Sequence, residues 1–233
     1  MKPNDDDANM AISKVFALRK DGRVEEAYEA ARAVYAINKG PYASSAMFWT
    51  GVDMLKMRVN EDRLDEAKKI SMALERLLDN VSDKNNWMHD AWNRCQRLLE
   101  RGEARANLVD NGPEHLQMGV WGEDLAVAYL REKGYVILER DWHSVHRDID
   151  IVAQQGDCIV FVEVKTRRNK DYADPVQAVD YKKQKNLGRA ISHYINYRKC
   201  DNPWRFDVIT IVGEFGCEMP EINHIEDFYL CNR

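Results

Sequence analysis

Residues 148–167 read DIDIVAQQGDCIVFVEVKTR, two apolar runs separated by the short polar break QQGD. Two apolar runs around a short turn signal predict two antiparallel strands joined as a β-hairpin. With Gly156 and Asp157 as the loop residues, glycine takes the first central position of a type II′ turn. The chain therefore contains a buryable hairpin, and its charged residues need an explanation.

The hairpin register places four charged side chains on one strand face, with Asp150 opposite Glu163 and Asp148 opposite Lys165. Like charges that face each other across two strands destabilise the sheet. Asp150 and Glu163 therefore need a cation, either Lys165 or a divalent ion held by the two carboxylates. The alternative is an ordinary solvated strand face with a salt bridge from Asp148 to Lys165.

The spacing from Asp150 to Glu163-Val164-Lys165 resembles the D-x(n)-E-x-K signature of the PD-(D/E)XK superfamily, the restriction-endonuclease-like fold. Within this superfamily, five ordered blocks over about residues 117–213 resemble the YraN-like family of small bacterial proteins. These blocks are GVWGEDLA at 119–126, DIDIV at 148–152, FVEVKTR at 161–167, AVDYKKQK at 178–185 and RFDVI at 205–209.

The resemblance implies a metal-dependent nuclease site. Asp150, Glu163 and the Val164 carbonyl would bind one Mg²⁺ or Mn²⁺, and Lys165 would orient or deprotonate the attacking water. Glu123 adds a further carboxylate to the site, or else is a first-turn glutamate favoured by the helix dipole. The expected catalytic set is therefore these three acidic residues with Lys165.

Other polar residues are assigned structural roles. His143 and His146 fall in a polar loop without paired cysteines or a second histidine cluster, so we do not expect them to be metal ligands. Asp207 lies inside an apolar strand, where we expect it to be a buried partner for Arg205 or for a backbone amide.

The stretch 165–205 is basic, with 11 Lys and Arg against 4 Asp residues in a chain whose net charge is −5. Such a stretch beside a metal site could track a phosphate backbone. We expect Arg167, Arg168, Lys183 and Lys185 to bind nucleic acid. The alternative is a solvated helix face followed by a polar loop.

Two functions follow from these features. The first is a nuclease that hydrolyses phosphodiester bonds of nucleic acid, DNA ahead of RNA. The second is a catalytically inactive nucleic-acid-binding or protein-interaction module on the same fold. The net acidic charge and one departure from the family favour the second, because Arg147-Asp148 stands where the family usually has Gly-Glu.

The expected fold is a restriction-endonuclease-like α/β core, a mixed sheet flanked by helices, preceded by an all-α domain. The nuclease-like domain should span 113–233, with helix, three strands, helix and strand in that order. The first domain should span 1–108, and the boundary is signalled at 101–115, where periodicity fades and Asn-Gly-Pro intervenes.

The first domain is expected to be an array of helical hairpins. Amphipathic segments are predicted at 12–37, 62–70 and 87–99. Two Glu-Ala steps, at Ala27 and Ala67, lie 40 residues apart, and the pattern resembles tetratricopeptide repeats without their Trp-Leu-Gly part. The array either offers a groove to a protein partner or is a bundle that packs on the nuclease-like domain.

Composition points to a cytoplasmic protein without a membrane partner. No apolar run approaches the ~20 residues of a membrane span, and the N-terminus MKPNDDDANM is acidic where a signal peptide is basic and then apolar. Five cysteines without a CxxC pair predict reduced structural thiols, with neither zinc nor a disulfide framework.

Overall fold

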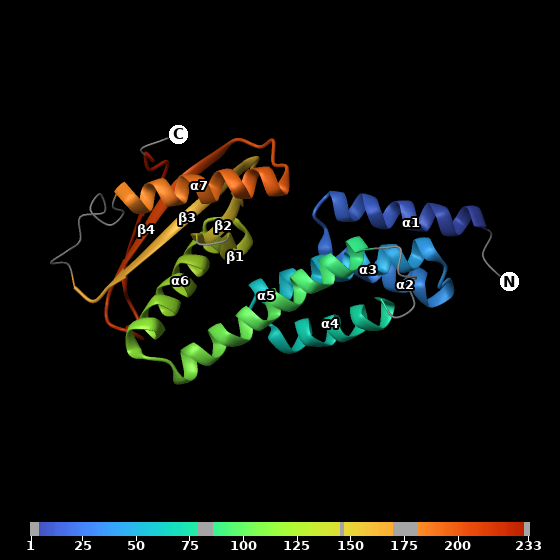
Figure 1. The fold of residues 1–233 in the computed structure, drawn as a ribbon, viewed down its shortest axis with the longest axis horizontal. Helices are drawn as coiled ribbons and strands as arrows, with labels where there is room; N and C mark the ends of the chain where they lie inside the picture. The colour runs from blue at the N-terminus through green and yellow to red at the C-terminus, as the bar shows by residue number, and fades with distance from the viewer. Residues whose placement is uncertain (1–4, 79–85, 145–146, 170–180, 231–233) are drawn as a thin grey trace. The chain divides into compact units, whose positions relative to one another are not determined.

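A computed structural model of the chain describes residues 5–78, 86–144, 147–169 and 181–230. The chain divides into two compact units, Met1–Ala104 and Arg105–Arg233. The first unit is all-α, and the second is an α/β unit with a mixed five-stranded sheet (Figure 1). The expected fold class, a helical domain before an α/β core, is therefore confirmed.

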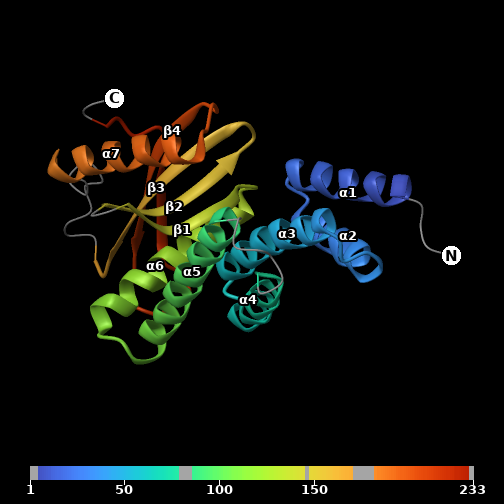
Figure 2. The same cartoon turned by 45° about the vertical axis from the view of Figure 1, so that its right-hand side comes forward.

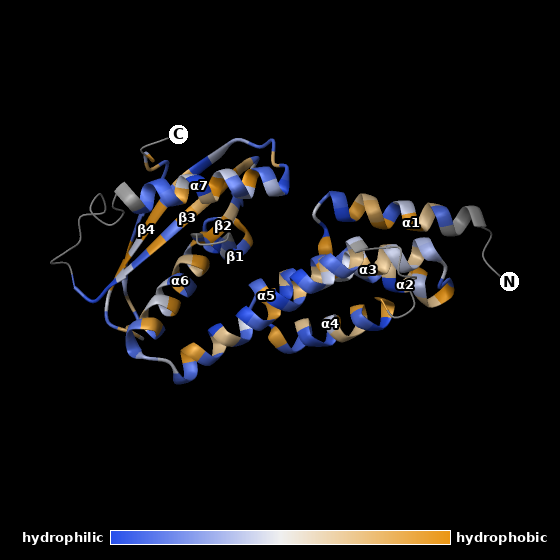
Figure 3. Ribbon diagram, viewed as in Figure 1, coloured by the Kyte–Doolittle hydropathy of each residue, from blue (hydrophilic) through white to orange (hydrophobic). Residues whose placement is uncertain are grey.

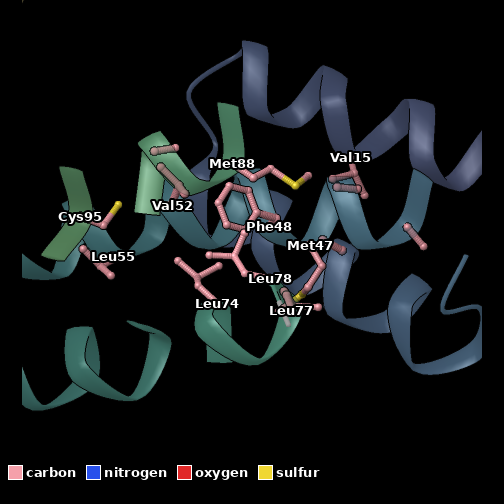
Figure 4. Close-up of a cluster of buried hydrophobic side chains, with 14 of the residues drawn as sticks. Val15, Met47, Phe48, Val52, Leu55, Leu74, Leu77, Leu78, Met88 and Cys95 are labelled. Atoms are coloured by element: carbon pink, nitrogen blue, oxygen red, sulfur yellow. The ribbon is translucent and has the colours of Figure 1, made fainter. Parts of the chain in front are cut away.

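The first unit consists of helices that pack around one of their number, α3. Its helices are α1 (Asp5–Lys20), α2 (Val24–Ile37), α3 (Pro41–Asn60), α4 (Leu64–Leu78) and the first part of α5 (Asn86–Asn111). Phe48 and Leu55 of α3 lie in one buried cluster with Leu74 of α4 and Met88 of α5 (Figure 4). Twelve residues of α3 are buried, because other helices pack on it from more than one side.

Two of the turns between helices in this unit are similar and lie 40 residues apart. Gly22 between α1 and α2 has φ +73°, and Asp62 between α3 and α4 has φ +58°. The arginine that follows each of them, Arg23 or Arg63, pairs with the glutamate three residues later. Both alanines of the predicted repeat are buried. The unit therefore contains two similar helical hairpins in succession.

The segment 101–115, where the helical periodicity fades in the sequence, is helical up to Asn111. The next helix, α6, begins at Glu114, so the break is confined to the Asn-Gly-Pro step. Gly102 lies inside the continuous helix α5. A Cβ at this position would lie 2.8 Å from a methyl carbon of Leu64. Glycine here allows close helix packing, and the division between the units falls inside α5.

The second unit has its sheet in the strand order β1-β2-β3-β4-β5, with neighbouring strands antiparallel except for the parallel pair β3 and β4. The predicted order of helix, three strands, helix and strand is confirmed, and β5 is added at the edge. The elements are α6 (Glu114–Glu132), β1 (Val136–Ser144), β2 (Arg147–Gln155), β3 (Cys158–Arg167), α7 (Tyr181–Arg198), β4 (Trp204–Val212) and β5 (Glu221–Ile225).

The sheet lies between α6 and α7 (Figure 2). Alternate side chains of the strands project to opposite faces, so each strand supplies both cores. Val160 and Val162 of β3 pack in the cluster with α6, whereas Phe161 between them packs in the cluster with α7. Hydrophilic residues predominate along α5 and α7 as a whole (Figure 3), which leaves each helix with a polar outer face.

The cysteines of the described residues are free thiols, as the sequence predicts: Cys95, Cys158, Cys200 and Cys217. Burial raises the pKa of the Cys95 thiol to about 11, which suits an unreactive core residue. Cys231 lies outside the described residues. Within the described ranges, no helix is both long enough and apolar enough to cross a membrane.

We expect residues 105–233 to fold when expressed without residues 1–104, because both cores of the sheet are built from this unit. A fragment of 113–233 should fold too, but with a free energy of unfolding lower by about 1–3 kcal/mol. It lacks Arg105, which donates to the Val120 carbonyl at 3.0 Å and to Asp124 at 2.7 Å. Thermal denaturation followed by circular dichroism measures both. No cooperative transition in 105–233 would show that the units share a core.

Candidate functional site

The hairpin has the register that the sequence predicts over five residue pairs, from Gln155↔Cys158 to Ile151↔Val162. Gly156 has φ +57°, as the first central position of a type II′ turn requires. The pairing of β2 with β3 ends at Ile151 and Val162, and the charged residues of the hairpin lie beyond these two residues. The turn and the hydrophobic alternation therefore fix the hairpin only up to the edge of the site.

Asp150 is held by a backbone group of the neighbouring strand. Its Oδ2 accepts a hydrogen bond of 2.7 Å from the N–H of Val164. In a continued ladder Val164 would pair with Ile149, so the carboxylate takes the place of a main-chain acceptor. One oxygen of Asp150 is thereby fixed against β3, and the carboxylate lies beside the segment that carries the E-V-K residues.

The strand pleat is interrupted at the same point. Ile149 packs in the cluster on the α7 side and Ile151 in the cluster on the α6 side, although residues two apart in a regular strand share a face. The alternation of side chains along the hairpin predicts that both lie on one face, and this prediction is wrong. Next to Asp150, on β1, Asp141 has φ +50° between the paired residues Arg140 and Trp142.

Glu163 is completely buried in the middle of the sheet. Its Oε1 pairs with the Nζ of Lys165 and also with the Nζ of Lys183 from α7. Its Oε2 is buried and has no hydrogen-bond partner within the described part of the chain. A buried carboxylate oxygen without a partner is costly, so this atom marks a position that a cation or a water molecule would stabilise.

This arrangement strongly raises the pKa of Asp150. Burial raises its pKa, and the nearby charges of Glu163 and Glu123 raise it further, to about 8. The Val164 N–H and the Lys183 ammonium act in the opposite direction without cancelling the effect. A carboxyl group in such a position loses its proton readily only when another cation approaches.

Glu123 is held by a residue that the sequence did not single out. Its Oε2 pairs with the guanidinium of Arg105, and the adjacent Asp124 binds both Arg105 and Arg140. Burial raises the pKa of Glu123, although Arg105 opposes this. The predicted third carboxylate is thus close enough to raise the pKa of Asp150 but is engaged by Arg105. No sequence block marked Arg105, because it precedes all five.

The donor set fits a hard divalent cation with few protein ligands. In the described ranges, no group of three or more His, Cys, Asp or Glu side chains is arranged to hold a metal ion. Asp150, the partnerless oxygen of Glu163 and the Val164 carbonyl are the atoms available. Mg²⁺ keeps several waters and takes one or two carboxylates, so a set of this size suits Mg²⁺ or Mn²⁺.

His143 lies in strand β1 opposite Asp148, so the expectation that it falls in a polar loop is wrong. The Nδ1 of His143 lies 3.3 Å from Asp141 and 3.6 Å from Asp148. Asp148 therefore faces His143, and Lys165 pairs with Glu163 instead. The alternative of a solvated strand face with a salt bridge from Asp148 to Lys165 is wrong. His146 lies outside the described residues.

Asp207 has the structural role expected for it. It is fully buried and accepts hydrogen bonds from Arg205, from the Asp227 N–H at 2.9 Å and from the His224 ring, whose Nε2 lies 2.9 Å away. Burial acts to raise its pKa, but the hydrogen bonds from His224 and Arg205 hold that pKa below its ordinary value. The carboxylate joins β4, β5 and the segment after β5.

The four predicted phosphate-binding residues differ in their environments. Lys183 lies in the carboxylate site on Glu163. Arg168 pairs with Glu114 at 2.6 Å on the surface. Arg167 is partly exposed at the end of β3, and Lys185 is exposed on α7.

We expect the stability of the metal-free protein to fall as the pH rises from 5 to 8. Asp150 has an ordinary pKa of about 3.9 when unfolded and a raised one when folded, so the stabilisation from its proton is complete below about pH 4 and is lost as the pH approaches 8. Asp150→Asn should flatten this part of the Tm profile in EDTA. The exposed neighbour Asp148→Asn is the control, and equal slopes in both variants would contradict the assignment.

Comparison with known proteins places the second unit in a family. The family described as "Uncharacterised protein family UPF0102" matches residues 122–211. A UPF0102 protein of Bacteroides thetaiotaomicron is 45% identical over 116 residues, which is 50% of this chain and 94% of the relative. One from Rhodococcus opacus is 39% identical over 118 residues, covering 49% and 98%. One from Syntrophomonas wolfei is 44% identical over 110 residues, covering 47% and 94%.

These relatives are matched over nearly their whole length, whereas about half of this chain takes part in each match. The matched family segment contains β2, β3 and α7, and with them Asp150, Glu163, Lys165 and Lys183. Arg105 precedes it. From its match to these relatives, the chain belongs to the UPF0102 family, the YraN-like family that its sequence blocks resemble.

Proposed function

We propose that the second unit is a metal-dependent nuclease that hydrolyses phosphodiester bonds of DNA or RNA. The observation that carries this proposal is the Oε2 of the buried Glu163, which has no hydrogen-bond partner among the described residues, beside a carboxyl of Asp150 whose pKa is strongly raised. A buried carboxylate oxygen without a partner, beside a second carboxyl that is partly buried, is a place where a divalent cation would be stabilised. The resemblance to the PD-(D/E)XK signature supports the same reading.

The residues of the site divide the work of hydrolysis. Asp150, Glu163 and the Val164 carbonyl would hold Mg²⁺ or Mn²⁺, which when bound lowers the pKa of a water and stabilises charge on the phosphate. Asp150 is pre-oriented for this task by the Val164 N–H. Lys165 orients or deprotonates the attacking water from its place on β3, where its side chain is partly exposed.

Lys165 and Lys183 both pair with the same oxygen of Glu163. They neutralise the buried carboxylate when no divalent cation does so. A lysine displaced from Glu163 remains beside the site, where its ammonium is placed to meet a substrate phosphate. In this way Lys183 pairs with Glu163 when no cation is bound and contacts a phosphate, as predicted from its sequence, once the cation displaces it.

A second function, nucleic-acid binding without catalysis, is favoured by a separate observation. Glu123 is engaged by Arg105, and Asp148 faces His143, so neither supplements the two carboxylates. A site of this kind could bind a cation and a phosphate backbone without activating water. The nuclease assay below separates the two functions.

The helical unit serves either packing or the binding of a protein partner. Its two hairpins with a 40-residue repeat are similar to the stacked hairpins of tetratricopeptide arrays. Binding in such arrays uses the surface formed by successive hairpins.

We expect the full chain to cleave at least one of a panel of single-stranded, duplex and branched DNA and RNA substrates in Mn²⁺. Glu163→Gln and Asp150→Asn should abolish cleavage and also the rise in Tm on adding Mn²⁺, because both remove a ligand charge. That rise corresponds to about 2.7 kcal/mol at 100 times the dissociation constant. Lys165→Ala should keep the rise in Tm but lose cleavage, because its task concerns water and phosphate.

The matched control is Asp148→Asn, an exposed carboxylate on the same strand, which should retain both properties. A rise in Tm without cleavage of any substrate would favour the non-catalytic module. A rise in Tm that persists in Glu163→Gln would remove the metal site from Glu163 and refute the proposal.

A further inference from the structure

Helix α7 has a cationic outer face. Its 18 residues include five Lys and Arg and no Asp or Glu, in a chain of net charge −5. Its inner side, with Leu187, Ala190, Ile191 and Tyr194, packs on the sheet. Lys185 and Arg189 are exposed on the side of α7 that the core does not use, whereas Lys183 pairs with Glu163 and Arg198 with Glu139.

Four exposed residues follow each other at intervals of four along this outer face: Lys185, Arg189, His193 and Tyr197. Residues four apart on a helix lie on one side and are separated by about 6 Å along the axis. We call these four residues the α7 stripe. It begins with two cationic residues, ends with two aromatic rings and is about 18 Å long.

The aromatic end of the stripe has the geometry of a stacking platform. The rings of His193 and Tyr197 are stacked, with centroids 6.3 Å apart and an angle of 25° between planes. Tyr197 is 49% exposed, and the guanidinium of Arg198 lies 5.5 Å from its ring centroid. Arg198 also pairs with Glu139. An accessible ring with a guanidinium close by is an arrangement on which proteins stack the bases of single strands.

The stripe starts at the candidate nuclease site. Lys183, two residues before Lys185, reaches Glu163 with its ammonium. The cationic end of the α7 stripe is thus the end next to the carboxylates, and the aromatic end lies farther along the helix. A strand whose phosphate occupies the carboxylate site would find two cations and then a stacking surface along α7.

We propose that the α7 stripe binds a single-stranded segment of nucleic acid. Lys185 and Arg189 contact its phosphates, and a base stacks on the ring of Tyr197. This inference rests on the proposed function for the nature of the ligand, and it specifies the substrate class as nucleic acid with unpaired bases. Bases inside an uninterrupted duplex have both faces covered by their neighbours and cannot reach the ring.

The test is the binding of a fluorescent 20-nucleotide oligo(dT) in EDTA, measured by anisotropy. Tyr197→Ala should raise Kd roughly 5- to 100-fold, because one base loses its stacking partner. Tyr197→Phe should bind as the parent does, because it keeps the ring face. Tyr42→Ala, which removes a tyrosine of 74% exposure from the first unit, is the matched control and should change nothing.

The cationic end is tested by salt dependence. Lys185→Gln with Arg189→Gln should reduce the slope of log K against log salt by about 1.4, because each lost phosphate contact on a single strand removes about 0.7. A duplex of 20 base pairs should show no dependence on Tyr197. An unchanged Kd in Tyr197→Ala, or an equal loss for duplex, would overturn the inference.

Two further outcomes separate this inference from neighbouring proposals. A polyglutamate peptide that displaces oligo(dT) at equal charge concentration, and binds with the same sensitivity to Tyr197→Ala, would assign the stripe to acidic proteins and overturn it. Binding does not require cleavage. If the chain cleaves no substrate and yet binds oligo(dT) through Tyr197, the proposed nuclease function fails and the inference about the α7 stripe is supported. If the parent cleaves nucleic acid but Tyr197→Ala binds oligo(dT) as the parent does, the inference about the α7 stripe is overturned and the proposed nuclease function is not.

Discussion

The burial of the Glu163 carboxylate is the constraint around which the second unit is arranged. A fully buried charge must be compensated, and here two lysines from different elements converge on one of its oxygens while the other has no partner among the described residues. Lys183 brings the start of α7 to the sheet, and Lys165 is fixed beside it on β3. Asp150 adds a second carboxyl that burial and Glu163 keep protonated at neutral pH. Two acidic groups and two lysines thus form a site that a cation and a phosphate would complete.

The local backbone serves this arrangement. A regular hairpin would satisfy the Val164 N–H with a main-chain carbonyl and place Ile149 on the same face as Ile151. Instead the side chain of Asp150 accepts this hydrogen bond, and the left-handed conformation of Asp141 accompanies the change of face. The irregularity directs a carboxylate toward β3 at the one place where the strands stop pairing. Strand irregularities of this kind commonly re-aim side chains beside functional sites.

Much of this could be predicted from the sequence, because the signals were local. Alternating apolar residues around Gly156 determined the hairpin register, and the periodicity of α6 and α7 placed helices on both sides. The change of face at Ile149 could not be predicted, because no local signal in the sequence marks it. Arg105 was missed for the same reason, since nothing near it in the sequence indicates Glu123. Helix α3 was missed because its apolar residues are not confined to one face and so give no amphipathic pattern.

We propose above all that Asp150 and Glu163 together bind a divalent cation through the Glu163 oxygen that has no partner among the described residues. Anomalous diffraction from crystals of the full chain grown with Mn²⁺ tests this most directly. We predict one strong anomalous peak bonded to carboxylate oxygens of both Asp150 and Glu163, with Lys183 or Lys165 moved off the latter. A saturated crystal without a peak there, or with manganese bound instead at His143 and Asp148, would contradict the claim.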